Sequence, residues 1–262
     1  MERIILTGAS GFLGKNLIER ISKEKIIILP HEEIKVTTIK PFSRFFFLSA
    51  YGNMAHHDDD DKIIQANLLD LVDMATQAKR FEFDSFVFIS TSSVKLKYQT
   101  LYSRTKKAAE EVLLALAEKH NLPFCIIRPY SITGVGEQKE HLIPTLIRAA
   151  MTGEIIDFVA KPVHDFIDVS DVVEAIINLS DHGVRGIYEV GTGMACSNQQ
   201  VREIVERITG KPISVRLVSK MRDYDNEEWV YKNYRARSFG WLPKKSLEDS
   251  IRGMVEAYKY EK

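Results

Sequence analysis

The chain has 262 residues, which is more than one average domain of about 150 residues and less than two. Apolar residues make up 45% and charged residues 27%, so the chain can bury a sizeable core and is not disordered by composition. The 36 basic residues balance the 36 acidic ones, which removes the electrostatic reason to expect nucleic acid or an anionic membrane as a partner. Two cysteines are too few for a disulfide framework, and no apolar run approaches the roughly 20 residues of a membrane span.

Short apolar runs alternate with segments of helical periodicity along the chain. The strand candidates are residues 3–7, 25–29, 44–49, 85–90, 123–127 and 186–190. The helix candidates are residues 14–22, 61–80, 102–120, 143–152, 169–180 and 198–208. Strands that are apolar on both faces suit a parallel sheet covered by helices, so the pattern predicts an α/β fold with a doubly wound parallel sheet of the Rossmann type. Because a strand begins almost at the first residue, we expect no signal peptide and a cytoplasmic location.

A glycine-rich turn joins the first strand candidate to the first helix candidate. It reads Thr7-Gly8-Ala9-Ser10-Gly11-Phe12-Leu13-Gly14, with a glycine at every third position. Glycines let the backbone turn sharply and approach a pyrophosphate, and the N-terminus of the following helix attracts negative charge. The turn therefore predicts a site for the phosphates of a dinucleotide.

Two segments interrupt the alternation. Only 14 residues separate Leu29 from Arg44, which leaves room for a loop and a minimal strand around residues 34–37. The run 56–61 reads H-H-D-D-D-D and invites a metal interpretation, but adjacent side chains in a loop project apart. We interpret it as a solvated loop whose last aspartate, Asp61, caps the next helix, and we expect no metal site.

Tyr102 and Lys106 lie four residues apart in a helix candidate and therefore on one face of that helix. A nearby ammonium favours the phenolate and lowers the pKa of the phenol from its usual value of about 10. Such a tyrosine can take a proton from a hydroxyl group or return one to a carbonyl. Tyr258 and Lys262 have the same spacing, but only Tyr102 follows a strand that ends in hydroxyl residues.

That strand ends in the run Ser90-Thr91-Ser92-Ser93, directly before Val94. A hydroxyl at this edge of the sheet can hydrogen-bond the reacting oxygen and shorten the path of the proton to a tyrosine. A single serine or threonine at a strand end is usually structural, whereas a cluster of four favours a function.

These motifs resemble those of the extended short-chain dehydrogenase/reductase superfamily, in particular the NAD-dependent epimerases, dehydratases and reductases of nucleotide sugars. The segment T-G-A-S-G-F-L-G looks like the phosphate loop of that family, and Y-S-R-T-K looks like its Y-x-x-x-K pair. The resemblance implies that Tyr102 and Lys106 are catalytic. Counting back from Val94, it also places the third catalytic hydroxyl on Thr91, with Ser92 as the alternative.

The resemblance extends over nearly the whole chain and implies a set of ligand contacts. The cofactor-binding residues would be Gly8, Ser10, Gly11, Phe12, Leu13, Gly14, His31, Leu48, Ser49, Ala50, Asn67, Ser90, Tyr102, Lys106, Pro129, Tyr130 and Ser131. The substrate-binding residues would be Tyr51, Thr91, Ser92, Ser131 and Arg222. The implied substrate is a nucleotide sugar, and the implied assembly is a homodimer that pairs the helices near Leu68 and Val112.

The end of the second strand selects the dinucleotide, because an acidic side chain there holds the ribose 2′-hydroxyl of NAD. The segment that follows Leu29 contains Glu32 and Glu33, either of which can reach that ribose. Lys15 can instead meet the 2′-phosphate of NADP. We favour NAD as the cofactor and keep NADP open.

The chain departs from the family pattern near the reacting groups. Ser92 and Ser93 stand where 4,6-dehydratases carry an acidic pair, so the acid and base that dehydration needs are missing there. Ser131 replaces the usual asparagine of R-P-x-N, and His164 replaces an arginine that often meets the nucleotide diphosphate. The V-Y-G that commonly follows the hydroxyl cluster, and a longer loop before the tyrosine, are also absent.

We expect a dinucleotide-binding domain over residues 1–135 plus 164–193, and a smaller substrate lobe over 136–163 plus 194–262. The main hypothesis for function is a nucleotide-sugar epimerase that transiently oxidises a sugar hydroxyl to a ketone. The alternative is an NADPH-dependent keto-sugar reductase of the dTDP-4-dehydrorhamnose reductase kind. The short segment after the second strand resembles the corresponding segment of those reductases. A non-catalytic dinucleotide-binding regulator is a third hypothesis, which Tyr102, Lys106 and the hydroxyl cluster disfavour.

Overall fold

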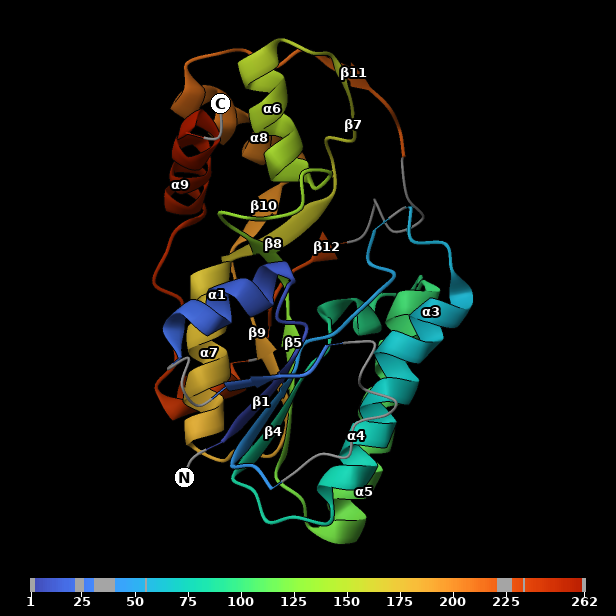
Figure 1. The fold of residues 1–262 in the computed structure, drawn as a ribbon. Coiled ribbons are helices and arrows are strands. Elements are labelled where there is room, and N and C mark those ends of the chain that lie inside the picture. Colours follow the sequence, from blue (N-terminus) through green and yellow to red (C-terminus); the bar gives the residue numbers. More distant parts are fainter. Residues whose placement is uncertain are drawn as a thin grey trace.

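The computed structural model describes residues 3–21, 26–30, 41–54, 56–220, 228–232 and 234–260. Within these ranges, a parallel sheet of six strands has the order β2-β1-β3-β4-β5-β9 (Figure 1). Its strands are β1 (Ile4–Thr7), β2 (Ile26–Ile28), β3 (Arg44–Phe47), β4 (Ser85–Ile89), β5 (Phe124–Pro129) and β9 (Gly186–Val190). The predicted doubly wound parallel sheet is confirmed, and the predicted strand around 34–37 lies outside the described residues.

Helices cover both faces of this sheet (Figure 1). One face is covered by α1 (Phe12–Arg20) and α7 (Val169–Asp181), and the other by α3 (Asp60–Ile64), η2 (Gln65–Leu69), α4 (Asp70–Ala78) and α5 (Leu101–His120). The central strands are buried on both faces, which explains why they appear in the sequence as continuous apolar runs. Leu17 and Ile176 belong to the core on one face, and Met74 and Leu113 to the core on the other.

The chain leaves β1 for β2 on one side and returns to β3 on the other side of β1. Such a reversal opens a crevice at the carboxyl ends of the two strands on either side of it, where open α/β sheets bind ligands. The Thr7 hydroxyl oxygen accepts hydrogen bonds from the backbone N–H groups of Leu48 (3.2 Å) and Ser49 (3.3 Å). This pairing fixes the ends of β1 and β3 at the base of the crevice.

A second group of elements lies beyond the carboxyl ends of the sheet (Figure 1). Its helices are α6 (Leu142–Thr152), α8 (Asn198–Thr209) and α9 (Leu247–Tyr260), which share a core that includes Leu146, Val201 and Ile251. Its strands are β6 (Ser131–Thr133), β7 (Ile156–Phe158), β8 (Val163–Asp168), β10 (Ala195–Ser197), β11 (Val215–Leu217) and β12 (Glu228–Trp229). Strand β8 pairs with β6, β10 and β12, and β7 pairs with β11.

The two short 3₁₀ turns η3 (Ser92–Lys95) and η4 (Arg235–Phe239) complete the described elements. No described helix combines the length and the apolar composition that a membrane span requires. The division of the chain into two domains at the boundaries given above stays a prediction.

Candidate active site

A cavity of about 1590 Å³ lies between the carboxyl ends of the sheet and the second group of elements. The predicted site residues that line it are Gly8, Ser10, Gly11, Phe12, Leu13, Gly14, Leu48, Ser49, Ala50, Tyr51, Ser90, Thr91, Tyr102, Pro129, Tyr130 and Ser131. Asn67, Ser92 and Lys106 lie behind its wall, each at most 1% exposed. His31 and Arg222, like Glu32 and Glu33, fall outside the described residues.

The glycine-rich turn after β1 fits a phosphate ligand by its backbone geometry. Gly8 has a φ of +71°, and a Cβ atom there would lie 2.7 Å from the backbone of Leu48 and Ser49. A Cβ atom on Gly14 would lie 2.1 Å from the carbonyl oxygen of Gly8, so a side chain would push the helix away from the turn. No side chain caps α1 at Gly11, so the first N–H groups of this helix are available to an anion. These residues therefore fit the pyrophosphate of a dinucleotide.

Hydroxyl groups after β4 form a connected chain along the cavity wall. The Thr91 hydroxyl donates to the Ser93 oxygen at 3.0 Å, and the Ser93 and Ser103 oxygens are 2.7 Å apart. Thr91 lines the cavity at half-burial, so its hydroxyl can also accept a hydrogen bond from a ligand. Ser93 and Ser103 also line the cavity, and neither was among the predicted site residues, although Ser93 belongs to the same hydroxyl run in the sequence.

Ser92 has a different environment from its neighbour Thr91. Its hydroxyl donates to the carbonyl oxygen of Pro129 at 2.9 Å and accepts from the indole N–H of Trp229 at 2.8 Å. The side chain thereby joins the η3 turn to the end of β5 and to β12. Of the two hydroxyls that the sequence left open, the structure brings Thr91 to the cavity and Ser92 into its supporting wall.

Tyr102 lies in the first turn of α5, where Thr100 caps the helix by accepting from the Ser103 N–H. Its side chain is half-buried where it lines the cavity, and this burial raises the pKa of Tyr102 to about 12. The sequence predicted a lowered pKa from the nearby ammonium of Lys106. That prediction is wrong for this structure, because desolvation of the phenolate is the dominant effect.

Lys106 is fully buried, one helical turn after Tyr102. Its ammonium donates to the carbonyl oxygen of Ile89 at 2.9 Å and approaches that of Ser49 at 3.5 Å. It also lies 4.6 Å from the centre of the Phe88 ring. Burial lowers the pKa of Lys106 to about 7, and the carboxylate of Glu110 partly opposes this shift. Lys106 therefore joins the ends of β3 and β4 directly beneath the cavity.

Asn67 is fully buried in η2, the π-helical turn. Its side-chain amide exchanges hydrogen bonds with the backbone of Tyr51, donating at 2.7 Å and accepting at 3.1 Å, and it donates to the Thr105 hydroxyl at 3.3 Å. Asn67 therefore fixes the loop after β3 against α5. A direct contact of Asn67 with the cofactor stays a prediction.

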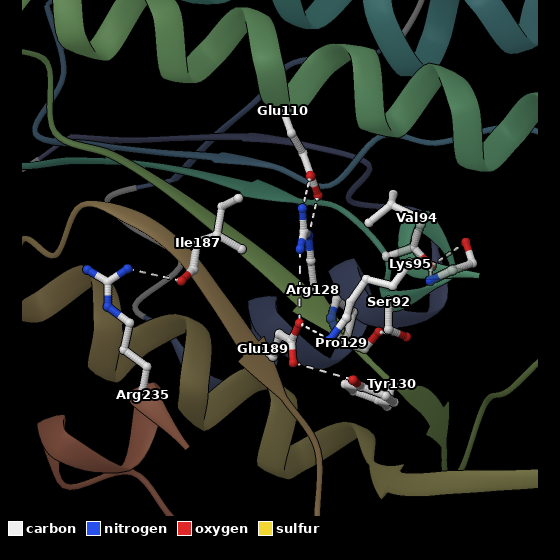
Figure 2. Close-up of polar contacts among 12 residues, drawn as sticks. Ser92, Val94, Lys95, Glu110, Arg128, Pro129, Tyr130, Ile187, Glu189 and Arg235 are labelled. Carbon is white, nitrogen blue, oxygen red and sulfur yellow. Dashed lines mark hydrogen bonds and ion pairs between the residues drawn. The ribbon is translucent and has the colours of Figure 1, made fainter. Parts of the chain in front are cut away.

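A network of charged side chains supports the same wall from below (Figure 2). Arg128 forms two hydrogen bonds with the fully buried Glu110, one of them at 2.9 Å from Nε. On its other side, an Arg128 nitrogen is 4.0 Å from Glu189, which also accepts from Lys95 at 2.7 Å and from the Tyr130 hydroxyl at 3.4 Å. The network connects α5, β5, β9 and η3.

Ser131 and His164, which both differ from the family pattern, lie in contact with each other in the structure. The Ser131 hydroxyl oxygen lies 3.4 Å from His164 Nδ1, and both residues line the cavity. The His164 ring is 5.5 Å from the centre of the Trp229 ring. A smaller hydroxyl, an imidazole and an indole thus form this part of the cavity. Trp229 was not predicted, because a lone tryptophan carries no motif.

The acidic run 56–61 lies at the edge of the site. The helix that follows is capped by Asp59, which accepts from the Lys62 N–H at 2.9 Å, and not by Asp61 as predicted. The cap lies two residues earlier because α3 already begins at Asp60. The His57 ring stacks on Tyr51 at 4.2 Å, so one of the two histidines supports the cavity wall.

Comparison with known proteins agrees with this geometry. The chain is 27% identical over 205 residues to the low-salt glycan biosynthesis protein Agl12 of Haloferax volcanii, covering 72% of this chain and 65% of that protein. It is 22% identical to GDP-6-deoxy-D-mannose reductase of Pseudomonas aeruginosa, covering 98% of this chain and 97% of the reductase. The structure of MoeE5 in complex with UDP-glucose and NAD shares the fold with a TM-score of 0.88 at 21% identity, covering 99% of each chain.

The family model of the NAD-dependent epimerase/dehydratase family matches residues 4–191, which is more than half of the chain and includes the glycine-rich turn, the hydroxyl run and Tyr102. The relatives and structural neighbours are NAD(P)-dependent epimerases, dehydratases and reductases of the extended short-chain dehydrogenase/reductase type. The chain therefore belongs to the NAD-dependent epimerase/dehydratase family, whose members modify nucleotide sugars.

Proposed function

We propose that this protein is an NAD(P)-dependent nucleotide-sugar epimerase that transiently oxidises a sugar hydroxyl to a ketone. The observation that carries the proposal is the cavity itself, which is lined by the glycine-rich turn, Thr91 and Tyr102 together. Its volume of about 1590 Å³ exceeds the roughly 300–1,000 Å³ of a site for one small ligand, so it can hold a dinucleotide and a second nucleotide.

In this proposal Tyr102 moves the proton of the reacting hydroxyl, and Thr91 holds the reacting oxygen by a hydrogen bond. The bound nicotinamide supplies the acceptor and donor of hydride, and in its oxidised form a positive charge. Lys106 joins the ends of β3 and β4 under the site and keeps the helix of Tyr102 at a fixed distance from the Thr91 turn. Ser93 and Ser103 offer a path for the proton away from Thr91.

The reductase alternative has support of its own. In such a reductase Tyr102 would donate its phenol proton to the ketone. The GDP-6-deoxy-D-mannose reductase of Pseudomonas aeruginosa also matches this chain from end to end. We therefore keep an NADPH-dependent keto-sugar reductase as the second candidate function.

One experiment separates the two candidates. The purified protein is denatured, the released nucleotide is identified by chromatography, and the native protein is assayed with UDP-, dTDP-, GDP- and CDP-sugars. An epimerase is expected to release NAD and to convert one of these sugars without added cofactor. A protein that emerges without nucleotide and consumes NADPH with a keto-sugar would contradict the epimerase and support the reductase.

The variant Tyr102→Phe tests the catalytic assignment common to both candidates. Loss of a positioned proton donor is expected to lower kcat by about 10²- to 10⁴-fold. Binding of NAD(P)H, followed by its fluorescence, is expected to be unchanged, because the glycine-rich turn is untouched. Full activity in this variant would exclude Tyr102 as the proton-transfer group.

A further inference from the structure

A histidine and a glutamate form a second polar group on the cavity wall, apart from the hydroxyls that follow β4. Glu137 lies in the loop after β6, and His141 precedes the first residue of α6. His141 Nδ1 is 2.9 Å from one carboxylate oxygen of Glu137, and both residues line the cavity. Neither residue belongs to the motifs discussed above.

Glu137 is itself held in place from below. Its other carboxylate oxygen accepts from the Thr133 hydroxyl at 2.7 Å, and Thr133 is fully buried at the end of β6. The Glu137 side chain is 6% exposed, whereas that of His141 is 32% exposed. A buried hydroxyl thus orients a carboxylate, and the carboxylate orients an imidazole whose other edge is accessible. Carboxylate–imidazole pairs of this kind fix the ring tautomer, because Nδ1 must carry the proton that it donates.

Among the residues that the structure describes, the second nitrogen of the ring contacts a thioether. His141 Nε2 lies 3.2 Å from the sulfur of Met54, in the loop after β3. With its proton on Nδ1, the neutral ring has no proton at Nε2 to donate to the thioether, so this contact is not a hydrogen bond and a polar ligand can displace the flexible methionine side chain. With Nδ1 protonated toward Glu137, the neutral ring presents a lone pair at Nε2, which accepts a hydrogen bond from a hydroxyl group.

The charge of this wall indicates which part of a substrate it meets. Glu137 and the exposed Glu140 both line the cavity beside His141. Two carboxylates repel the diphosphate of a nucleotide sugar, whereas the uncharged hydroxyls of the sugar are accepted. We propose that His141, positioned by Glu137, is a specificity-determining residue whose Nε2 binds a hydroxyl of the substrate's sugar. The inference rests on the proposed function, since it takes the ligand to be a nucleotide sugar.

The test compares ligands with and without the sugar. UDP-glucose, dTDP-glucose, GDP-mannose and CDP-glucose are titrated into the purified protein by calorimetry, each beside its free nucleoside diphosphate. The variants are His141→Asn, which keeps a group near Nδ1, and His141→Gln, which keeps one near Nε2. His120→Gln, at the exposed end of α5, is the matched control, and thermal unfolding shows that each variant is folded.

His141→Asn is expected to weaken binding of the preferred nucleotide sugar about three- to tenfold, the effect of one hydrogen bond, without changing binding of its nucleoside diphosphate. His141→Gln is expected to restore most of the loss, and Glu137→Gln to weaken only the nucleotide sugar. If His141→Asn weakens binding of the nucleotide sugar and of its nucleoside diphosphate equally, His141 lies at the diphosphate and the inference is overturned. Unchanged binding of the nucleotide sugar in His141→Asn would also overturn it. So would a loss of affinity in His141→Gln that is as large as the loss in His141→Asn. A wild-type protein that binds none of the nucleotide sugars would contradict the proposed function, and this inference with it.

Discussion

Adjacent hydroxyl residues in this protein have separate tasks, as Thr91 and Ser92 show. Thr91 lines the cavity and its hydroxyl is hydrogen-bonded to Ser93, whereas Ser92 is hydrogen-bonded to Pro129 and Trp229 within the wall. Thr91→Val keeps the shape and removes the hydrogen bond to the reacting oxygen, so kcat is expected to fall about 10- to 100-fold. Steady-state kinetics with the substrate found in the nucleotide-sugar assays measures this change.

Ser92→Ala serves as the comparison for Thr91→Val. It removes the hydrogen bonds that Ser92 makes with the Pro129 carbonyl and the Trp229 indole N–H, which is expected to cost about 1–3 kcal/mol of stability. Urea unfolding measures this loss. The fall in kcat is expected to be smaller than for Thr91→Val, and the reverse order would make Ser92 the catalytic hydroxyl.

The buried Lys106 makes stability depend on pH in a defined direction. Burial lowers its pKa in the folded state from 10.5 to about 7. Between these values the unfolded chain binds more protons at this residue, so the contribution of Lys106 to the free energy of unfolding rises with pH. The slope is at most about 1.4 kcal/mol per pH unit. Below pH 7 both states are protonated and the contribution is constant.

Lys106→Met removes this titration. Urea unfolding of nucleotide-free wild type and variant at pH 7 and pH 9 measures the difference in their free energies of unfolding. The wild type is expected to gain stability relative to the variant as the pH rises. A difference that is the same at both pH values would show that Lys106 keeps its ordinary pKa in the folded protein.

At the scale of elements, Lys95 and Glu189 join the η3 turn to β9 (Figure 2). Lys95 directly follows Val94 and stands at the tyrosine position of the V-Y-G pattern that this chain lacks. Glu189 is 4% exposed and needs a cation, but Lys95 is 46% exposed and partly screened by solvent. Lys95→Met and Glu189→Gln are therefore each expected to lower the stability of the protein by less than the removal of one partner from a fully buried ion pair would.

A double-mutant cycle isolates this pair. The variant with both substitutions is expected to be more stable than the sum of the single effects predicts, by about 1 kcal/mol in urea unfolding. Lys107→Met, an exposed lysine of α5, is the matched control and is expected to show no coupling with Glu189→Gln. Additive effects of Lys95→Met and Glu189→Gln would mean that the contact contributes nothing to stability.

Local pattern was sufficient to predict the central sheet but not the smaller strands. The strands β1, β3, β4 and β5 are buried on both faces, so each appears as an apolar run between turns. Strands such as β10 and β12 have three and two residues and gain their partner β8 from distant parts of the chain. A segment of two or three residues is too short to carry a pattern from which its pairing with β8 could be predicted.

The same distinction applies to the site. The glycine-rich turn and the spacing of Tyr102 and Lys106 are local, and both could be predicted. The environments of these groups depend on the whole fold, so the raised pKa of Tyr102 was missed, as was the contact of His141 with Glu137. Sequence patterns therefore identify reacting groups better than they predict protonation or supporting contacts.

At the scale of the whole molecule, the homodimer is the prediction with the simplest test. The helices α4 and α5 pack side by side, and Leu69 at their edge is 48% exposed. Leu68 and Val112, the residues near which the family resemblance places the interface, are half-buried on the same helical layer. A stable dimer covers about 800 Å² per partner, and an apolar side chain such as Leu69 is expected to lie within that area. Light scattering is therefore expected to give twice the mass of one chain.

A charge on this helical layer is expected to dissociate the dimer. Leu69→Lys places an ammonium in an apolar interface, which is expected to raise the dissociation constant at least about tenfold. Leu242→Lys is the matched control, because Leu242 is 54% exposed in the loop before α9, away from these helices. Light scattering over a range of protein concentrations measures both variants. A wild-type protein with the mass of one chain would contradict the dimer, and a dimer that survives Leu69→Lys but not Leu242→Lys would place the interface elsewhere.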